Sequence, residues 1–143
     1  MVNVGRGALE KSFLNHTRLA KQGSTPSHRL VQFYAIECGL KSMILRQKGA
    51  LTSKNIDRQL FGNETFFDHN LVLLAKMVGL PASVFGNCEV FRIGKNPDRR
   101  STLNLHSAHL AWRYGIIINS EDEAIIIKAF ENVGKLIERE LMR

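Results

Sequence analysis

The sequence predicts an all-α fold, an up-and-down bundle of four to five helices in a single domain over residues 1–143. Two observations lead to this prediction. Apolar residues recur every three or four positions over long stretches, and turn signals separate these stretches at short intervals. The length of 143 residues suits one domain of ordinary size, with enough chain to bury a core and too little for two domains.

The first long periodic stretch covers residues 26–48. Thr25 and Pro26 are typical of a helix start, because threonine caps the first turn and proline fits within it. Gly49 is typical of a residue that ends a helix. Within the stretch, apolar residues follow one another at spacings of three and four: Leu30, Phe33, Ile36, Leu40 and Ile44.

The second long stretch closes the chain at about residues 121–141. Ser120 and Glu123 have the spacing of a capping box, and the carboxylates of the first turn suit the positive end of a helix. The apolar stripe that follows has the period of a helix: Ile126, Phe130, Val133, Ile137 and Leu141.

Shorter patterns occupy much of the rest of the chain. Residues 8–21 form a modest amphipathic helix in this interpretation, and residues 49–67 form a connection. Asp68 is a candidate cap for a helix of about ten residues over 69–78. Residues 81–98 carry no clear pattern.

A further helix is expected before the closing one. Asp98 stands where it can cap a helix that runs from Arg100 to Arg113, and Gly115 stops it. The three isoleucines at residues 116–118 favour extended backbone, because β-branched side chains suit strands.

The net charge of +7 is concentrated at the N-terminal side. Residues 1–60 hold ten Lys or Arg and three Asp or Glu, which by itself equals the net charge of the whole chain. A basic segment attracts the phosphates of RNA, DNA, nucleotides or anionic lipid. A solvated helical surface that is basic for solubility explains it equally well.

Composition also excludes several classes of protein. No window approaches the roughly 18 apolar residues of a membrane-spanning helix, and the first residues lack the apolar core of a secretory signal. Cys38 and Cys88 alone can build neither a disulfide framework nor a closed zinc site. We therefore expect a soluble cytoplasmic protein with free thiols.

No cofactor motif is present, and we expect no cofactor. Gly5 and Gly7 follow no strand, and no glycine-rich loop ends in Gly-Lys-Ser or Gly-Lys-Thr. His106 and His109 lie three positions apart on one face of the expected helix, which is a candidate edge of a metal site. No third ligand is evident nearby, so we expect no metal.

Arg100 and His106 are the candidate catalytic residues. Metal-independent RNA cleavage needs a base for the 2′-hydroxyl proton and a cation for the phosphorane charge, and histidine and arginine suit these tasks. Six positions on an α-helix turn through about 600°, so the two side chains diverge by about 120°. They share a site only if the helix begins later or a second chain completes it. Spacing alone favours the alternative, a surface arginine near a histidine that packs or caps.

Trp112, Arg113 and Tyr114 form an aromatic and basic cluster at the expected helix end. Such a cluster can stack a base and bind a phosphate. The alternative, which residue type alone favours, is a core aromatic, a structural arginine and a cap.

Three blocks in this order resemble the HEPN domains, helical nucleotide-binding-type domains of prokaryotes and higher eukaryotes. The first, residues 35–41, is similar to the family's Ala-x-Glu-x-x-Leu-Lys helix. The second, residues 68–74, is similar to its His-Asp-Leu-x-x-Leu segment, with Asn70 where the family usually has Asp. The third, residues 112–115, is similar to the Arg-Tyr segment before the last helix. The order and rough spacing agree over about residues 8–141.

The resemblance implies a bundle that forms a homodimer, with its functional groove at or near the dimer interface. Many members are metal-independent ribonucleases with an Arg-x4–6-His motif, whose spacing Arg100 and His106 satisfy. Active members usually carry Asn, Asp or His directly after the arginine, and this chain has Ser101. Members with a Trp-Arg-Tyr variant are thought to bind nucleotides or to pair with nucleotidyltransferases.

The residues that the resemblance assigns to RNA or nucleotide binding are Lys41, His69, Arg113 and Tyr114. The favoured hypothesis is a nucleic-acid- or nucleotide-interacting module of a prokaryotic toxin–antitoxin or phage-defence system, with a nucleotidyltransferase as candidate partner. The first alternative is an endoribonuclease that uses Arg100 and His106. The second is a dimerising structural bundle without a ligand.

Overall fold

The computed structural model describes residues 5–49, 69–86, 88–94 and 101–143. In these residues the chain forms five α-helices and a small two-stranded hairpin. The helical prediction is therefore confirmed, and the hairpin is an addition to it. None of the described helices is both long and apolar enough to cross a membrane.

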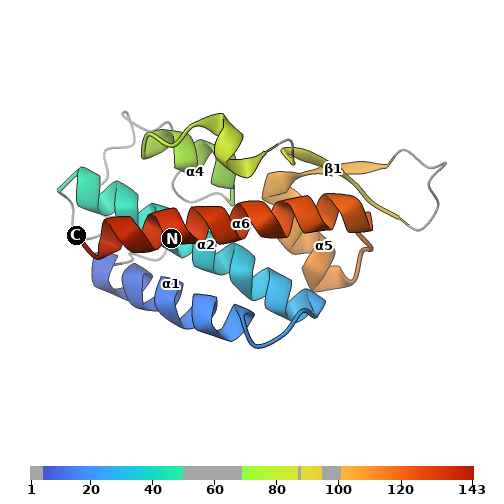
Figure 1. The fold of residues 1–143 in the computed structure, drawn as a ribbon, viewed down its shortest axis with the longest axis horizontal. Helices are drawn as coiled ribbons and strands as arrows, with labels where there is room; N and C mark the ends of the chain where they lie inside the picture. The colour runs from blue at the N-terminus through green and yellow to red at the C-terminus, as the bar shows by residue number, and fades with distance from the viewer. Residues whose placement is uncertain (1–4, 50–68, 87, 95–100) are drawn as a thin grey trace.

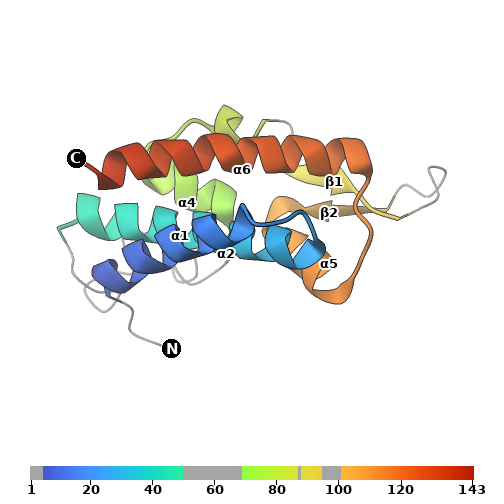
Figure 2. The same cartoon turned by 60° about the horizontal axis from the view of Figure 1, so that its bottom comes forward.

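Helix α2 (Pro26–Gln47) is the centre of the arrangement (Figure 1). It packs against α1 (Arg6–Ala20), α4 (Leu71–Met77), α5 (Ala108–Tyr114) and α6 (Ser120–Leu141). Figure 2 shows that α1 runs antiparallel to α2, whereas α6 runs in the same direction as α2. The order is therefore not a simple alternation of up and down, because α4, the hairpin and α5 lie between α2 and α6 in the chain.

The ends of α2 are held by side chains. The Thr25 hydroxyl accepts a hydrogen bond from the backbone N–H of His28 at 3.4 Å, as the sequence predicted for a cap. Buried side chains occupy most positions from 33 to 45, so the middle of the helix is covered on nearly all sides. At the other end Arg46 donates to the carbonyl of Glu140 at 2.5 Å and so ties α2 to the end of α6.

Helix α6 begins one residue earlier than a Ser120 cap would place it, because Asn119 is the cap and Ser120 is the first helical residue. The side chain of Asn119 accepts from the backbone N–H groups of Glu121 and Asp122 at 3.1 Å each. The predicted capping box of Ser120 and Glu123 is therefore wrong, because the asparagine amide already reaches the first-turn donors. The predicted apolar stripe is confirmed over most of its length, and its buried residues are Ile126, Phe130, Val133 and Ile137.

Helix α4 is shorter than predicted and has a different cap. Asn70 accepts a hydrogen bond from the backbone N–H of Leu73 at 3.2 Å and precedes the first helical residue, Leu71. Asp68, the predicted cap, lies outside the described residues. The cap also places His69 before the helix rather than in it, two residues ahead of the first helical residue.

The helix predicted from Arg100 to Arg113 is wrong over its first half. Strand β2 (Thr102–Asn104) pairs antiparallel with β1 (Val90–Arg92), and a short 3₁₀ turn η3 (Leu105–Ser107) leads into α5. Phe91, which opposes Leu103, is 1% exposed, so burial of this hairpin outweighs the helical periodicity. Gly115 ends α5 in a left-handed conformation, as predicted.

The expected extended segment at residues 116–118 is confirmed at its end. Ile118 forms an isolated bridge with Ile93, beside the hairpin. The backbone N–H of Gly94 also donates to the carbonyl of Ile117 at 2.7 Å. This segment therefore joins α5 to α6 along the edge of the hairpin.

Aromatic rings fill the core between α2, α5 and α6. Phe33 is fully buried and lies in edge contact with Trp112 and Phe130, with ring centroids 6.4 and 6.0 Å apart. The Trp112 indole N–H donates to Glu123 at 3.1 Å. Trp112 is thus a core residue, which was the structural alternative in the sequence interpretation, and it fixes α5 against the start of α6.

Candidate functional site

Glu37 lies at the centre of a polar cluster on the face of α2. Its side chain is 11% exposed, and its two oxygens have different partners. Oε1 lies 2.5 Å from Nδ1 of His69, and Oε2 accepts from Nζ of Lys41 at 3.1 Å. A buried carboxylate needs such partners, because an unpaired buried charge is strongly unfavourable. Two predicted binding residues, Lys41 and His69, are therefore brought together by a third residue.

The contact with Glu37 fixes the imidazole of His69. A carboxylate on one ring nitrogen sets the ring orientation and leaves the other nitrogen for a further partner. The His69 side chain is 43% exposed, so Nε2 is the ring nitrogen that remains for a ligand. This arrangement is typical of histidines that bind phosphate or transfer protons.

His109, from the first turn of α5, packs against His69 with the two rings tilted at 46°. The two ring centroids are 4.4 Å apart, and the ring of Phe33 lies 5.1 Å from that of His109 on the buried side. His109 is 7% exposed. Its Nδ1 atom is buried and has no hydrogen-bond partner among the described residues. Burial, and then the nearby His69, lower the pKa of His109. Both effects favour the neutral form of the His109 imidazole.

The three histidines His69, His106 and His109 meet at one open pocket of about 310 Å³, which Asn70 and Ser107 also line. We refer to it as the histidine pocket. His106 is exposed in the turn before α5, and His69 comes from the segment before α4. The predicted catalytic residue His106 and the predicted binding residue His69 thus line the same cavity.

His106 and His109 were only a candidate edge of a metal site, and their geometry differs from the one considered. The two residues do not share one helical face, since His106 lies in the 3₁₀ turn and His109 lies in α5. In the described segments, no group of three or more His, Cys, Asp or Glu side chains is arranged to hold a metal. The pocket instead brings imidazoles together without acidic metal ligands on its walls.

Arg113 lies close to the same face of the molecule. It donates to the hydroxyl of Tyr34, whose ring centroid is 6.4 Å from that of His69. Hydrogen bonds to Tyr34 and then to Tyr114 raise the pKa of Arg113. Arg113 is exposed rather than buried, and Tyr114 is 69% exposed at the end of α5.

Sequence reasoning missed Glu37 and Tyr34 as site residues, although a signal for them exists. Tyr34, Glu37 and Lys41 follow at spacings of three and four, which places them on one face of a helix. A buried acidic residue in an apolar helix, next to a tyrosine and a lysine on that face, indicates a polar cluster. His109 gave a weaker signal, because its packing depends on the separate segment that carries His69.

Of the predicted catalytic pair, Arg100 and His106, only His106 belongs to the residues that the structure describes. Arg100 lies outside the described residues, and Ser101, the residue after it, is exposed. The premise that both sit on one α-helix is wrong, because residues 102–104 form a strand. Their predicted divergence by about 120° on a helix therefore does not apply.

Several cations of the basic N-terminal segment have structural partners. Lys41 pairs with Glu37, Arg46 donates to the carbonyl of Glu140, and Arg6 lies 3.9 Å from Glu10. The exposed lysines and arginines of α1 are therefore the part of this segment best placed to act as a general electrostatic surface. Lys54 and Arg58 lie outside the described residues.

Comparisons of the chain with protein-family models, with curated proteins and with solved structures find no match.

Proposed function

We propose that this chain is a helical module that binds the phosphate groups of RNA or of a nucleotide at the histidine pocket. The observation that carries the proposal is the convergence of His69, His106 and His109, from two separate segments, on one open cavity. The pair of Glu37 and His69 orients one imidazole toward a ligand. Arg113, beside Tyr34 and His69, adds a cation on the same face.

The cluster suits a phosphate better than an uncharged ligand. Imidazole N–H groups and a guanidinium donate hydrogen bonds to phosphate oxygens, and charged partners strengthen such bonds. The exposed ring of Tyr114, next to Arg113, offers a stacking surface for a base. The HEPN resemblance, the homodimer, the defence-system role and the nucleotidyltransferase partner are compatible with this binding and stay predictions.

The binding proposal is tested with a fluorescein-labelled single-stranded RNA of mixed sequence and fluorescence anisotropy. The double variant His69→Gln, His106→Gln keeps a donor for Glu37 and removes both exposed imidazoles of the pocket. We expect it to bind RNA at least about tenfold more weakly than the wild type, with a smaller salt dependence. The matched control is His16→Gln, which changes a histidine on α1.

Two outcomes would overturn the binding proposal. One is equal affinity of the double variant and the wild type. The other is loss of binding only when the exposed α1 cations Lys11 and Arg18 are changed to glutamate, which would assign binding to general charge on α1.

A second proposal for the same pocket is metal-independent RNA cleavage, since two exposed imidazoles on one cavity can act as base and acid. His106 takes the proton of a 2′-hydroxyl, and the resulting oxygen attacks the adjacent phosphorus. The bond from phosphorus to the 5′-oxygen breaks, and His69 donates a proton to that oxygen. The products are a 2′,3′-cyclic phosphate and a 5′-hydroxyl.

The cleavage proposal is tested by incubating the same RNA with purified protein in EDTA. We expect cleavage by the wild type and a loss of about a hundredfold or more in rate for His106→Ala. Equal cleavage by both proteins, or none by either, would remove this second proposal and leave the binding proposal intact.

A further inference from the structure

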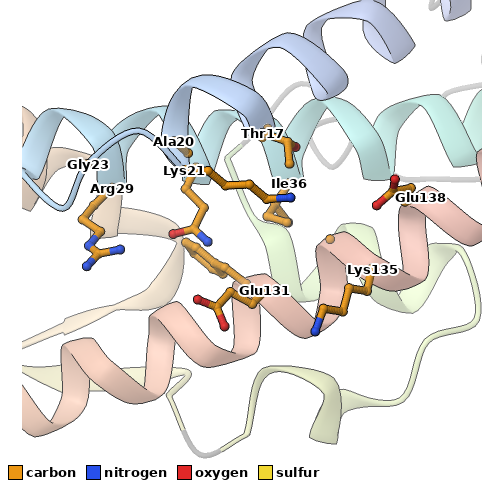
Figure 3. A pocket seen from close by; sticks show the side chains of 13 residues that line it. Thr17, Ala20, Lys21, Gly23, Arg29, Ile36, Glu131, Lys135 and Glu138 are labelled. Atoms are coloured by element: carbon orange, nitrogen blue, oxygen red, sulfur yellow. The ribbon is translucent and has the colours of Figure 1, made fainter.

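A second cavity, of about 370 Å³, lies between α1, α2 and α6 (Figure 3). None of its lining residues lines the histidine pocket. Its volume falls in the usual range of small-molecule sites. We call it the three-helix cavity.

The three-helix cavity has an apolar floor. Ile36 from α2 and Phe130 from α6 form part of its lining. Next to them is Gly134, in the interior of α6, where an added Cβ would lie 3.7 Å from Ile36 Cδ1, at an ordinary contact distance. Packing therefore does not require glycine here, although glycine is unfavourable inside a helix. The missing side chain leaves the floor open.

Arg29 supplies an unsatisfied cation at one end of the three-helix cavity. Its Nε is buried and has no hydrogen-bond partner in the described part of the chain, and no ion pair of Arg29 occurs there. In Figure 3 Arg29 lies at one end of the labelled lining residues. A buried guanidinium N–H without an acceptor is unfavourable, and a bound anion would supply that acceptor.

Carboxylates lie along the α6 wall of the three-helix cavity. Glu131 and Glu138 line it from one helix, seven residues or about two turns apart. In Figure 3 Glu138 lies at the opposite end of the view from Arg29, with Glu131 between them. Glu138 has no ion pair in the described structure, whereas Glu131 lies 4.0 Å from Lys128. The cavity thus has Arg29 at one end and Glu138 at the other, over an apolar floor, and Lys135 also lines it from α6 between Glu131 and Glu138.

We propose that the three-helix cavity binds a small zwitterionic molecule. Its anionic group binds Arg29, its ammonium group binds Glu138, and its hydrocarbon body lies over Ile36 and Phe130. The lining holds two further cations, Lys21 on the α1 side and Lys135 on α6. The site is separate from the histidine pocket, so a test of zwitterion binding does not depend on the proposed function.

The test uses the full chain and simple probes with known charge spacing. Nitrogen-15 labelled protein is titrated with 4-aminobutanoate, 6-aminohexanoate and 8-aminooctanoate, and amide shifts are followed by NMR. Hexanoate and hexylammonium serve as probes with one charge only. We expect saturable shifts at amides of α1, α2 and α6 around the cavity, and at least about tenfold tighter binding of one zwitterion than of either singly charged probe.

Variants assign the two ends of the three-helix cavity. Arg29→Gln and Glu138→Gln are each expected to weaken the best zwitterion about tenfold, and Gly134→Leu, which fills the floor, is expected to abolish its binding. Lys11→Gln, an exposed cation of α1 that does not line the cavity, is the control and is expected to leave binding unchanged. Glu138 is exposed, so its variant keeps the test valid if Arg29→Gln fails to fold.

Three experimental outcomes would overturn the proposal of a zwitterion site. It is overturned if no ω-amino acid causes saturable shifts around the three-helix cavity. It is also overturned if hexanoate binds as tightly as every zwitterion, because the site would then recognise an anion alone. Binding that survives both Gly134→Leu and Glu138→Gln in folded protein would place the ligand elsewhere.

Discussion

The Nδ1 atom of His69 lies 2.5 Å from Oε1 of Glu37, a contact that joins the middle of α2 to the segment before α4. The second oxygen of Glu37 accepts from Lys41 on the same helix. One buried carboxylate therefore both stabilises the fold and orients an imidazole of the histidine pocket.

We expect Glu37→Gln to lower the free energy of unfolding by about 2 kcal/mol, because the substitution removes the negative charge that pairs with Lys41 and His69 in a poorly hydrated place. Urea denaturation measures this change. The matched control is Glu10→Gln, whose partly exposed pair with Arg6 at 3.9 Å contributes at most about 0.5 kcal/mol. Equal effects of the two substitutions would show that Glu37 has no special structural role.

Because the imidazole of His109 is buried, we expect the protein to lose stability in mild acid. Its pKa in the folded state is lowered from the usual 6.5 by burial and by His69, so the unfolded chain takes up the proton first. The free energy of unfolding should therefore decrease as the pH falls below about 6.5 toward the folded-state pKa of His109. Above that window the contribution of His109 to stability is fully present.

The variant His109→Phe isolates this contribution, since phenylalanine fits the aromatic contacts with Phe33 and His69 and does not titrate. We expect a shallower decrease in the free energy of unfolding between about pH 7 and pH 5 than in the wild type. Urea denaturation at several pH values measures both slopes. Parallel curves for the two proteins would contradict a depressed pKa at His109.

Asp122 holds the hairpin to the start of α6. Its carboxylate accepts from the backbone N–H of Arg92 at 2.8 Å and from the guanidinium at 2.9 and 3.0 Å. Hydrogen bonds from Arg92 lower the pKa of Asp122 below its usual 3.8. This contribution to stability is therefore present above about pH 3.8 and is lost as the pH falls through the folded-state pKa.

We expect Asp122→Ala to lower the urea midpoint at neutral pH, because the Arg92 backbone N–H and guanidinium lose their acceptor. Glu121→Ala is the control, since Glu121 is 82% exposed and lies 3.8 Å from Arg92. Its effect should be much smaller. A drop in midpoint of the same size for both variants would show that the interaction is only surface charge at the helix start.

Two helical glycines should respond to alanine in opposite directions. At Gly39 an added Cβ would lie 2.8 Å from side-chain atoms of Phe13 and Ile137, so Gly39→Ala is expected to destabilise the protein by roughly 1–3 kcal/mol. At Gly134 the nearest atom is 3.7 Å away, and Gly134→Ala should stabilise α6 by up to about 1 kcal/mol. Thermal unfolding measures both. Effects of the same sign would contradict the close approach of α1 and α6 at Gly39.

The two long helices could be predicted from sequence because their own periodicity reflects their packing. The stripe from Ile126 to Ile137 is buried as expected, and Thr25 caps α2 as expected. Local signals were sufficient there, since cap and stripe lie within one segment.

The hairpin could not be predicted in this way. Three residues from Thr102 to Asn104 are too short to show the alternation of a strand, and Leu103, His106 and Leu110 imitate the spacing of a helix. The deciding interaction is the pairing of Leu103 with the buried Phe91, twelve residues earlier. Pairing between separate segments is not visible in local periodicity.

In the candidate site, too, local sequence signals indicated single residues but not the contacts between separate segments. Lys41 and His69 came from sequence blocks, but the residue that joins them, Glu37, acts across 32 positions of the chain. His109 was considered only with its neighbour His106, whereas its closest ring partner is His69. Residue types were predictable, and their convergence depended on how α4 and α5 pack against α2.

The most direct test of the central claim follows the histidine rings by carbon-13 NMR while single-stranded RNA is added to the protein. The histidine pocket predicts that the ring resonances of His69, His106 and His109 shift together and saturate at one RNA concentration. Those of His16, on α1, and of His28, in the first turn of α2, should stay unchanged, because neither residue lines the pocket. Shifts confined to His16 and His28, or no shift of His69 and His106 at saturating RNA, would contradict the account.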